Sequence, residues 1–346
     1  YKKIKDIEKG DRVVTFSEVR NVLEFGTVMQ KLDTGIKRGY KVKTRKGREV
    51  IVSGDHPFLT PNGWKKVNEG LSVGERVATP NKLMNNGTEV LPKEEVELLA
   101  RMIADGYCGN SLGYTKKDEE MISVMRNICK SYGTDIVKTS ECSWRILRPG
   151  THGITEVLRR HGQSGKRSWE KKIPESIFRA TKELQRRFIE LLFSGDGWVL
   201  SDEVGYSSSS EELVLGISSL LLFFGINSSM YSKNTSFTYK GERRKGRPSY
   251  FLLVTRENSV KFMEEFNLTE AKYRDIFSWK KTGRTYKNNI KISEETTSKI
   301  MDAYKGRHKE INKLIYKPIY SGRSGTVVPK SFTVKGFTSE KYRKIY

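Results

Sequence analysis

The spacing of hydrophobic residues divides the chain into a region of short strands and a region in which helices and strands alternate. In residues 1–80, segments such as DRVVTF, GTVMQKL and YKVKTRKG are rich in Val, Thr and aromatic residues and are separated by breaks that contain Gly. Such segments predict β-strands. Residues 81–95 are rich in Asn, Gly and Pro and predict a linker. The first 80 residues are therefore expected to form an all-β module.

Beyond the linker, apolar residues recur at helical spacing in six segments, most of which end at Gly or Asn. The expected helices are 93–104, 118–133, 153–162, 181–195, 210–225 and 257–267. Pairs of β-rich segments lie between them. Residues 92–180 and 181–267 would then both have the order helix, two strands, helix, two strands, helix, which indicates a tandem duplication.

The chain carries a large excess of positive charge. It has 64 Lys and Arg against 41 Asp and Glu, a formal net charge of +23. Such an excess repels itself in the folded state, which points to a polyanionic partner such as nucleic acid. A merely basic surface is the alternative. No segment approaches the roughly 20 apolar residues of a membrane span, so we expect a soluble, cytoplasmic protein without a membrane partner.

Two helix ends share a pattern, a hydrophobic segment closed by a small residue, Asp and Gly: LLARMIADG in residues 98–106 and IELLFSGDG in residues 189–197. A small residue before the acid lets two helices approach closely, and the Gly after it permits a sharp helix end. If the two helices pack together, Asp105 and Asp196 lie side by side. Two adjacent carboxylates repel each other, and a divalent cation would offset that repulsion. With phosphate oxygens as further ligands, the pair is suited to phosphodiester cleavage.

These helix ends, with KKIPESIFRATKELQRRFIELLFSGDGW before the second and GYSSSSEELVLGISSLLLFFGI after it, resemble the LAGLIDADG homing endonucleases over residues 92–267. The resemblance implies a saddle of two αββαββα halves whose β-ribbons enter the major groove of double-stranded DNA. It also implies that Asp105 and Asp196 are catalytic residues that bind Mg²⁺ or Mn²⁺, and that a monomer cuts both strands of a long asymmetric site. Arg101 departs from the family's pattern, so its side chain must point away from the helix interface, or the interface is looser than usual. As an alternative, both aspartates are ordinary residues beside a turn at a helix C-terminus, where the helix dipole disfavours negative charge.

The resemblance also implies basic residues at the site and on the ribbons. In this family, a basic side chain from each half often assists catalysis, and Lys138 and Lys233 are the candidates. A phosphate or solvent contact is the alternative for both. Arg243, Arg244, Lys245 and Arg247 are expected to contact phosphates at a hairpin tip, unless that hairpin is a solvated loop. The full set of DNA-binding candidates is Arg145, Lys233, Tyr239, Lys240, Arg243, Arg244, Lys245 and Arg247.

The β-rich module contains REVIVSGDHPFLT, in which a strand ends in Ser-Gly-Asp-His-Pro. With YKKIKDIEKGDRVVTF, it resembles the Hint fold of inteins, whose motif of a hydroxyl residue, two further residues and His corresponds to Ser53 and His56. The resemblance implies that His56 donates a proton to a departing amine during an acyl shift, and that Ser53 orients the carbonyl or stabilises its oxyanion. A histidine held by a turn hydrogen bond is the alternative.

Splicing needs a Cys or Ser at the first residue and His-Asn at the end, whereas this chain runs from Tyr1 to Tyr346. The chain as printed is therefore not expected to splice, and its host exteins are expected to be absent.

Four regions are predicted in all. Residues 1–88 would form the N-terminal part of a Hint domain, and residues 89–267 would be a two-repeat endonuclease inserted in it. Residues 268–325 would add a basic DNA-contacting element with helical parts near 293–315, or a plain spacer. Residues 326–346 would return as the truncated C-terminal Hint strands.

The predicted fold class is α+β, a pseudo-symmetric tandem αββαββα saddle inserted in an all-β splicing domain. The predicted function is an intein-encoded endonuclease whose cuts promote the mobility of its own gene. Two alternatives are a DNA-binding protein of the same fold that does not cut, and a splicing element with an inert nuclease portion.

Overall fold

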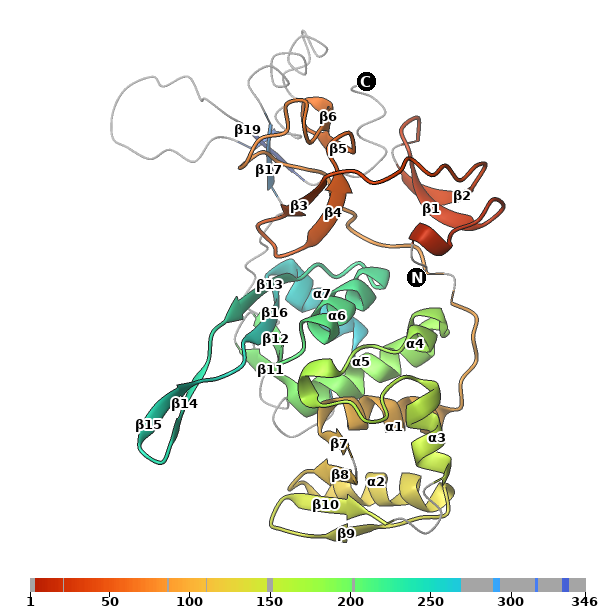
Figure 1. The fold of residues 1–346 in the computed structure, drawn as a ribbon, viewed down its shortest axis with the longest axis vertical. Helices are drawn as coiled ribbons and strands as arrows, with labels where there is room; N and C mark the ends of the chain where they lie inside the picture. The colour runs from red at the N-terminus through yellow and green to blue at the C-terminus, as the bar shows by residue number, and fades with distance from the viewer. Residues whose placement is uncertain are drawn as a thin grey trace. The chain divides into compact units, whose positions relative to one another are not determined.

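The computed structural model divides the chain into two compact units, each described here by itself (Figure 1). The α/β unit comprises residues 80–283 with 1–3 and 43–50, and the β unit comprises 4–42, 51–79 and 284–346. Within the described residues, no helix is long and apolar enough to cross a membrane. The described residues are 4–20, 22–85, 87–109, 111–147, 152–200, 203–268, 289–292, 315–316 and 332–335.

The first half of the α/β unit has the predicted order of elements. They are α1 (Lys93–Ala104), β7 (Gly106–Cys108), β8 (Leu112–Thr115), α2 (Glu119–Ser131), β9 (Ile136–Lys138), β10 (Ser143–Ile146) and α3 (His152–Arg160). The strands form an antiparallel sheet in the order β7-β8-β10-β9. A short connection then leads through η2 (Ser168–Glu170) and α4 (Glu175–Arg179) to the second half.

The second half repeats this order and adds a hairpin. Its elements are α5 (Lys182–Asp196), β11 (Gly197–Leu200), β12 (Glu203–Ser208), α6 (Glu211–Phe223), β13 (Ser229–Lys233), β16 (Ser249–Thr255) and α7 (Glu257–Glu265). The sheet order β11-β12-β16-β13 matches that of the first half. The added hairpin, β14 (Ser236–Tyr239) and β15 (Glu242–Lys245), projects away from this sheet in Figure 1. The predicted αββαββα duplication is thus confirmed.

All six predicted helices are present, with ends that differ by a few residues from the prediction. Three helices start where a side chain accepts a hydrogen bond from the first turn: Asp118 from the Met121 amide, Thr181 from Leu184, and Ser210 from Leu213. Such caps satisfy amides that the helix itself leaves without a partner. The capping residues therefore set where these helices begin.

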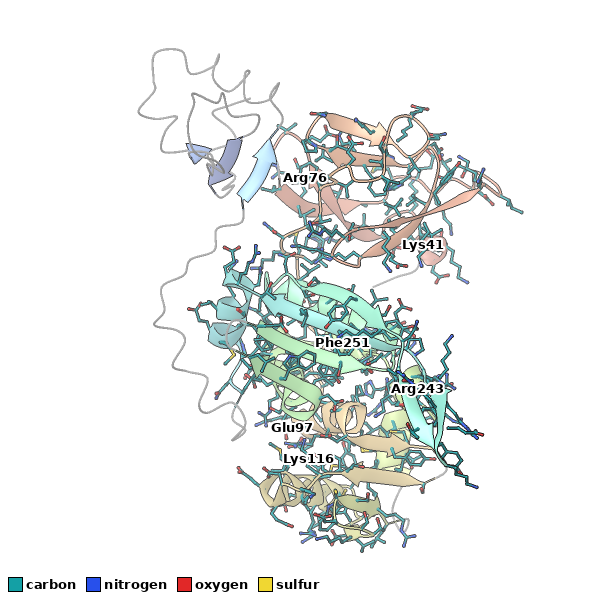
Figure 2. The ribbon with its side chains drawn as sticks, turned by 90° about the vertical axis from the view of Figure 1, so that its left-hand side faces the viewer. Lys41, Arg76, Glu97, Lys116, Arg243 and Phe251 are labelled. Atoms are coloured by element: carbon teal, nitrogen blue, oxygen red, sulfur yellow. The ribbon has the colours of Figure 1, made fainter. Side chains whose placement is uncertain are left out.

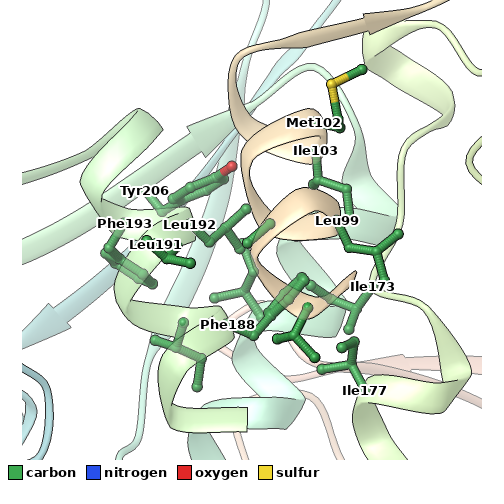
Figure 3. Packing of buried hydrophobic residues seen from close by; sticks show 14 of the residues in the cluster. Leu99, Met102, Ile103, Ile173, Ile177, Phe188, Leu191, Leu192, Phe193 and Tyr206 are labelled. Atoms are coloured by element: carbon green, nitrogen blue, oxygen red, sulfur yellow. The ribbon is translucent and has the colours of Figure 1, made fainter. Parts of the chain in front are cut away.

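Helices α1 and α5 pack against each other at the centre of the hydrophobic core (Figure 3). Leu99 and Met102 from α1, and Phe188 and Phe193 from α5, are completely buried. Truncation of such a side chain to Ala typically costs about 2–5 kcal/mol. The pairing of these two helices therefore fixes the relative position of their C-terminal ends.

The β unit begins with η1 (Ile4–Asp6) and three antiparallel strand pairs: β1 (Arg12–Ser17) with β2 (Val22–Thr27), β3 (Gly39–Lys43) with β4 (Glu49–Ser53), and β5 (Pro57–Thr60) with β6 (Gly63–Lys66). Apart from η1, the regular elements that the structure describes in residues 4–80 are all strands. The second strand was placed wrongly at GTVMQKL. A tight hairpin pairs Arg12 with Thr27, so Gly26 and Thr27 end the strand, and Met29 and Leu32 lie exposed beyond it.

Three further strands belong to the C-terminal part of the β unit: β17 (Asn289–Ile292), β18 (Ile315–Tyr316) and β19 (Phe332–Lys335), in the order β17-β19-β18. β19 agrees with the predicted return to strand structure near the end of the chain. The helical parts predicted near 293–315 lie, except for Ile315 in β18, outside the described residues. Strands from the basic segment and from the return segment thus share one sheet.

Candidate metal centre and nucleic-acid interface

The C-terminal ends of α1 and α5 approach closely at Gly195. A Cβ atom on Gly195 would lie 2.5 Å from the Cβ of Ala104 and 3.0 Å from Oδ2 of Asp105. No residue larger than Gly fits here without a shift of the helices. The sequence-based expectation of a small-residue contact is met, and it brings Asp105 and Asp196 to the same end of the helix pair.

The glycines after the two aspartates have a different role from the one expected. Gly197 has φ of −79°, and Gly106 also lies outside the left-handed region. Instead, each glycine lies against the last turn of its own helix. A Cβ on Gly106 would be 2.5 Å from Cα of Met102, and one on Gly197 would be 2.5 Å from the carbonyl oxygen of Phe193. Close approach, and not a positive φ, therefore requires glycine at both positions.

Asp105 forms an ion pair with a lysine that sequence reasoning missed. Nζ of Lys116 lies 2.9 Å from Oδ2 of Asp105, and the two side chains are only 15% and 17% exposed (Figure 2 labels Lys116). Lys116 directly follows β8, in which Tyr114 pairs with Gly106. The strand register therefore brings Lys116 to Asp105, and only knowledge of that register could have identified it.

Asp196 has a different environment. Its side chain remains open to solvent, and the hydroxyl of Tyr206 donates a hydrogen bond to its Oδ2 at 3.3 Å. Neighbouring protein atoms remove part of its hydration, and this desolvation, together with the negative charge of Asp105, raises the pKa of Asp196 to about 6. Lys171, Tyr206 and Lys116 oppose that rise. Asp196 thus has no direct cationic partner as strong as that of Asp105.

Strand register makes Tyr114 and Tyr206 equivalent, because they pair with Gly106 and Gly197. Both are essentially inaccessible to solvent, and burial is the main cause that raises the pKa of each phenol. Tyr206 contacts Asp196, whereas Tyr114 accepts a hydrogen bond from the guanidinium of Arg101.

Arg101, whose place in the helix departs from the family's pattern, is 5% exposed and also donates to Sδ of Met121 in α2 at 3.1 Å. Arg101 therefore points away from α5, as the close approach of the helices requires.

Lys171 connects the two halves from the segment between them. Its buried ammonium group donates to the carbonyl oxygens of Met102 (3.0 Å), Ile103 (2.8 Å) and Gly106 (2.7 Å) at the end of α1. A cation at a helix C-terminus satisfies carbonyl groups that have no partner within the helix. Burial lowers the pKa of Lys171, and the charges of Asp196 and Asp105 oppose this. Lys171 thereby holds the end of α1 that carries Asp105.

The donor set of this site fits a hard divalent cation. Across the described part of the chain, no group of three or more His, Cys, Asp or Glu side chains surrounds a common point. Two adjacent carboxylates suffice for Mg²⁺, which is usually held by one or two carboxylates together with substrate phosphates and water. Desolvation, and then the negative charge of Asp105, raise the pKa of Asp196, and a bound cation would offset that repulsion. Asp105 and Asp196 are therefore suited to share a cation with a phosphate group.

The two lysines that sequence reasoning placed at the site lie in non-equivalent positions. Lys138 pairs with Trp144 in the first sheet, and the position equivalent to Lys138 in the second sheet is Met230, which pairs with Leu252. Lys138 lies over the Trp144 ring at 5.5 Å, whereas Lys233 lies over the rings of Tyr231 and Phe251. Their catalytic role stays a prediction, and Lys116 and Lys171 are the lysines that interact with the aspartates.

The hairpin β14–β15 has two chemically different faces, because side chains alternate along each strand. Ser236 and Thr238 pair with Lys245 and Arg243, and Phe237 and Tyr239 pair with Arg244 and Glu242. One face thus combines hydroxyl groups with two cations, and the other combines aromatic rings with one cation, Arg244, and one acid, Glu242. Arg243 is labelled in Figure 2.

The expected grouping of basic residues at the hairpin tip is only partly correct. Lys240 occupies the tip, with a left-handed φ of 51°, whereas Arg243 to Lys245 lie along β15. Arg247 lies at the base of the hairpin, where its guanidinium stacks 3.7 Å from the ring centre of Trp169. Residues 240–241 form the tight turn at the tip, and the whole of β15 lies between that turn and Arg247. Arg145, the candidate in the first half, is exposed on β10.

In the β unit, Ser53 ends β4 and His56 is exposed. The His56 amide donates to the carbonyl oxygen of Ser53 at 3.1 Å and closes a turn. Hydrogen bonds from the Ser53 hydroxyl and from Lys37 lower the pKa of Asp55, between them, to about 2. The imidazole of His56 lies edge-on to Phe58. Ser53 and His56 are thus neighbours in one turn, and their roles in splicing stay predictions.

Residues 183–267 match the family model described as "LAGLIDADG-like domain". This match spans α5 to α7 and includes Asp196. The second half of the α/β unit is therefore similar to a LAGLIDADG-like domain, which agrees with the resemblance found from the sequence.

Several curated proteins with different names share similarity with the chain. It is 32% identical over 274 residues to the replicative DNA helicase DnaB of Rhodothermus marinus. The aligned segment covers 73% of this chain and 28% of the helicase. It is 29% identical to the protein RecA of Mycobacterium tuberculosis (59% of this chain, 28% of that protein). It is 28% identical to the replication factor C small subunit of Methanocaldococcus jannaschii (56% and 11%). The chain thus spans less than a third of the length of these relatives.

Solved structures give similar partial matches. A crystal structure of an Ssp DnaB mini-intein variant is 37% identical and covers 26% of this chain and 56% of its own, with a TM-score of 0.23. The homing endonuclease I-DmoI in complex with DNA and Mn is 16% identical and covers 51% of this chain and 97% of its own, with a TM-score of 0.32.

Proposed function

We propose that the α/β unit is a divalent-metal-dependent endonuclease that cuts both strands of a specific DNA duplex. The observation that carries this proposal is the pair of carboxylates, Asp105 and Asp196, at the ends of two helices that meet at Gly195. The net charge of +23 and the basic hairpin β14–β15 support a DNA substrate. The match of residues 183–267 to the LAGLIDADG-like domain supports the same class of activity.

The residues of this chain position the reacting phosphate and neutralise its charge. Asp105 and Asp196 would hold Mg²⁺ or Mn²⁺, which lowers the pKa of a bound water and stabilises the leaving oxygen of the phosphodiester. Lys116, 2.9 Å from Asp105, is placed to attract a phosphate oxygen that approaches this carboxylate. Lys171 keeps the end of α1 fixed through three hydrogen bonds to its carbonyl groups. A fixed arrangement of charges is needed if it is to favour the transition state over the bound substrate.

We further propose that the chain is a segment inserted into a host protein, and that the cut promotes copying of its gene. A helicase, RecA and a replication factor subunit are different proteins by name, yet each contains a segment similar to this chain that makes up less than a third of its length. An inserted element explains that pattern better than a shared host activity does. No particular host follows from it.

The β unit is a second candidate for activity, as the splicing module of that insertion. The observation that favours it is the turn at the end of β4, which brings Ser53 next to His56. In such a module His56 would protonate the departing amine of an acyl shift. A precursor in which this chain is given a Cys or Ser at its start and His-Asn at its end, and is placed between host flanks, would test this: ligated host protein should form, and His56→Ala should abolish the first step.

The cleavage proposal is tested with a plasmid that carries the host reading frame with this segment removed. We expect a double-strand cut that requires added Mg²⁺, and its loss in the variant Asp105→Asn plus Asp196→Asn. Asp118→Asn is a matched control, because the Asp118 side chain accepts a hydrogen bond from the Met121 amide at the start of α2 and Asn can make the same cap. Binding in chelator without a cut in Mg²⁺ would instead indicate a DNA-binding protein that does not cut. Full cleavage by the double variant would overturn the assignment of the site.

A further inference from the structure

The two sheets of the α/β unit each have one face covered by helices and one face turned away from them. On the helix-covered faces lie buried residues such as Tyr114 and Trp144 in the first sheet, and Tyr206 and Leu252 in the second. Because side chains alternate along a strand, the intervening residues form the opposite, outer faces. Strand register allows these outer faces to be compared position by position.

The outer face of the second sheet has an aromatic and aliphatic group at its centre, with the polar residues Glu203, Ser207, Ser229 and Ser249 beside it. The rings of Tyr231 and Phe251 stack at 5.0 Å with an interplanar angle of 7°, and Trp198 meets Phe251 edge-on at 6.3 Å. Lys233 covers the outer end of this group, 5.2 Å from the Phe251 ring (Figure 2 labels Phe251). Tyr231 is 39% exposed, and Leu200 on the same face is 60% exposed. Half-buried Leu253 completes an apolar surface that water can reach.

Most of the equivalent positions of the first sheet are polar, although Val137 takes the place of Ser229. Gly113 in the first sheet is equivalent to Gly205 in the second. Gly113 pairs with Tyr107 and Arg145. Gly205 pairs with Trp198 and Leu253. Arg145 therefore occupies the place of Leu253. Thr115 is likewise equivalent to Ser207. Thr115 pairs with Ser143 and Ser207 pairs with Phe251, so Ser143 occupies the place of Phe251. Arg145 and Thr115 are exposed. Only the aromatic ring that follows each Asp-Gly pair is kept, as Tyr107 and Trp198.

We propose that these two faces contact the two halves of the DNA target through different base chemistry. The inference rests on the endonuclease function proposed above. An apolar surface in the major groove favours thymine, whose C5-methyl group it can bury, whereas an exposed Arg favours guanine through N7 and O6. The second sheet therefore selects a thymine-rich half-site through Tyr231, Phe251 and Leu253. The first sheet selects guanine through Arg145.

The charge around the apolar surface favours DNA as its occupant over another protein. Lys233 lies at the edge of this surface, and the hairpin that continues from β13 and β16 carries Lys240, Arg243, Arg244 and Lys245. Cations at one end of a small apolar surface attract a polyanion, and phosphate contacts then fix the position of the bases over the rings. A protein partner would need an unusually acidic surface to match these cations.

The experiment starts from a pool of random 30-bp duplexes, from which the intact chain selects its preferred site in the presence of Ca²⁺. A variant with residues 236–245 replaced by Gly-Gly is then footprinted, and the half that loses protection is assigned to the second sheet. In the selected duplex, thymines of each half are separately replaced by deoxyuridine, which removes only the methyl group. We expect each replacement in the second-sheet half to weaken binding about fourfold and replacements in the other half to have little effect.

A protein variant tests the first sheet in the same assay. Arg145→Ala should weaken binding about tenfold or more and abolish the preference for guanine at one position. Arg159→Ala is the matched control, since Arg159 is an exposed arginine of the same half that lies on α3 and pairs with Glu156. Equal deoxyuridine effects in both halves, or an unchanged preference in Arg145→Ala, would overturn the inference while leaving the endonuclease proposal intact. Failure to select any duplex would instead contradict the proposed function itself.

Discussion

The two halves of the α/β unit share one chain path but surround their aspartates differently. In the first half, Asp105 is mostly buried and paired with Lys116, and the equivalent tyrosine is bound to Arg101. In the second half, Asp196 is open to solvent and bound to the neutral phenol of Tyr206. A duplicated fold thus fixes where the carboxylates lie, whereas single substitutions after duplication decide how each is neutralised.

The largest expected effect concerns the lysine that joins the halves. Lys171→Met would leave up to three carbonyl groups at the end of α1 without a donor, and we expect the free energy of unfolding to fall by about 2–4 kcal/mol. The neighbouring Lys172, which is half exposed and 3.7 Å from Glu212, is the matched control, and Lys172→Met should cost less than about 0.5 kcal/mol. Urea denaturation measures both. Similar small losses would show that the hydrogen bonds of Lys171 contribute little.

The contact between the halves is the next test. Gly195→Ala would place a methyl group 2.5 Å from Ala104, and we expect it to destabilise the unit by about 2 kcal/mol, even though Ala favours a helix. Ala104→Gly alone should also destabilise, because it loses helix propensity. Combined with Gly195→Ala, it should restore stability, since it removes the clash. Simple additivity of the two losses, measured by thermal unfolding, would show that the helices do not meet at this point.

The sequence predicts the elements of this unit well, because each helix is marked by its apolar spacing and by a capping residue such as Asp118 or Thr181. It also predicts the meeting of Asp105 and Asp196, since Gly195 before the second acid leaves room for a close helix contact. It misses Lys116 and Lys171. Their positions depend on strand register and on the path of the segment between the halves, which local sequence patterns do not determine. Lys138 and Lys233 seemed equivalent because they lie in corresponding strands, but a register difference places them on opposite faces.

The equivalent tyrosines offer a direct comparison of the two halves. Tyr114→Phe removes an acceptor from the buried guanidinium of Arg101, whose Nε already has no hydrogen-bond partner. We expect a loss of about 1.5–3 kcal/mol in unfolding free energy, because the partner is charged. Tyr206→Phe removes a bond of 3.3 Å to a solvent-exposed carboxylate and should cost about 1 kcal/mol or less. Urea denaturation under the same conditions measures both losses. A larger loss of unfolding free energy in Tyr206→Phe than in Tyr114→Phe would contradict this prediction.

The smallest effect separates the lysine found from strand register from one chosen from sequence. Lys116→Met should lower the rate of DNA cleavage about tenfold, equivalent to about 1.4 kcal/mol of barrier, because a positive charge beside Asp105 is lost. Lys138→Met should change the rate less than threefold, since Lys138 stacks on Trp144 on the helix-covered face. DNA binding in Ca²⁺ serves as the control, and it should be the same for both variants to within about threefold.

The dependence on metal concentration distinguishes two roles of Lys116. If its ammonium group assists the reaction, Lys116→Met should cut slowly even at saturating Mg²⁺. If it only occupies Asp105 in the absence of metal, the variant should instead cut faster at low Mg²⁺, because a competitor for the carboxylate is gone. That second outcome would make Lys116 a resting partner of Asp105. A tenfold loss in Lys138→Met with none in Lys116→Met would return the catalytic assignment to the strand position chosen from the sequence.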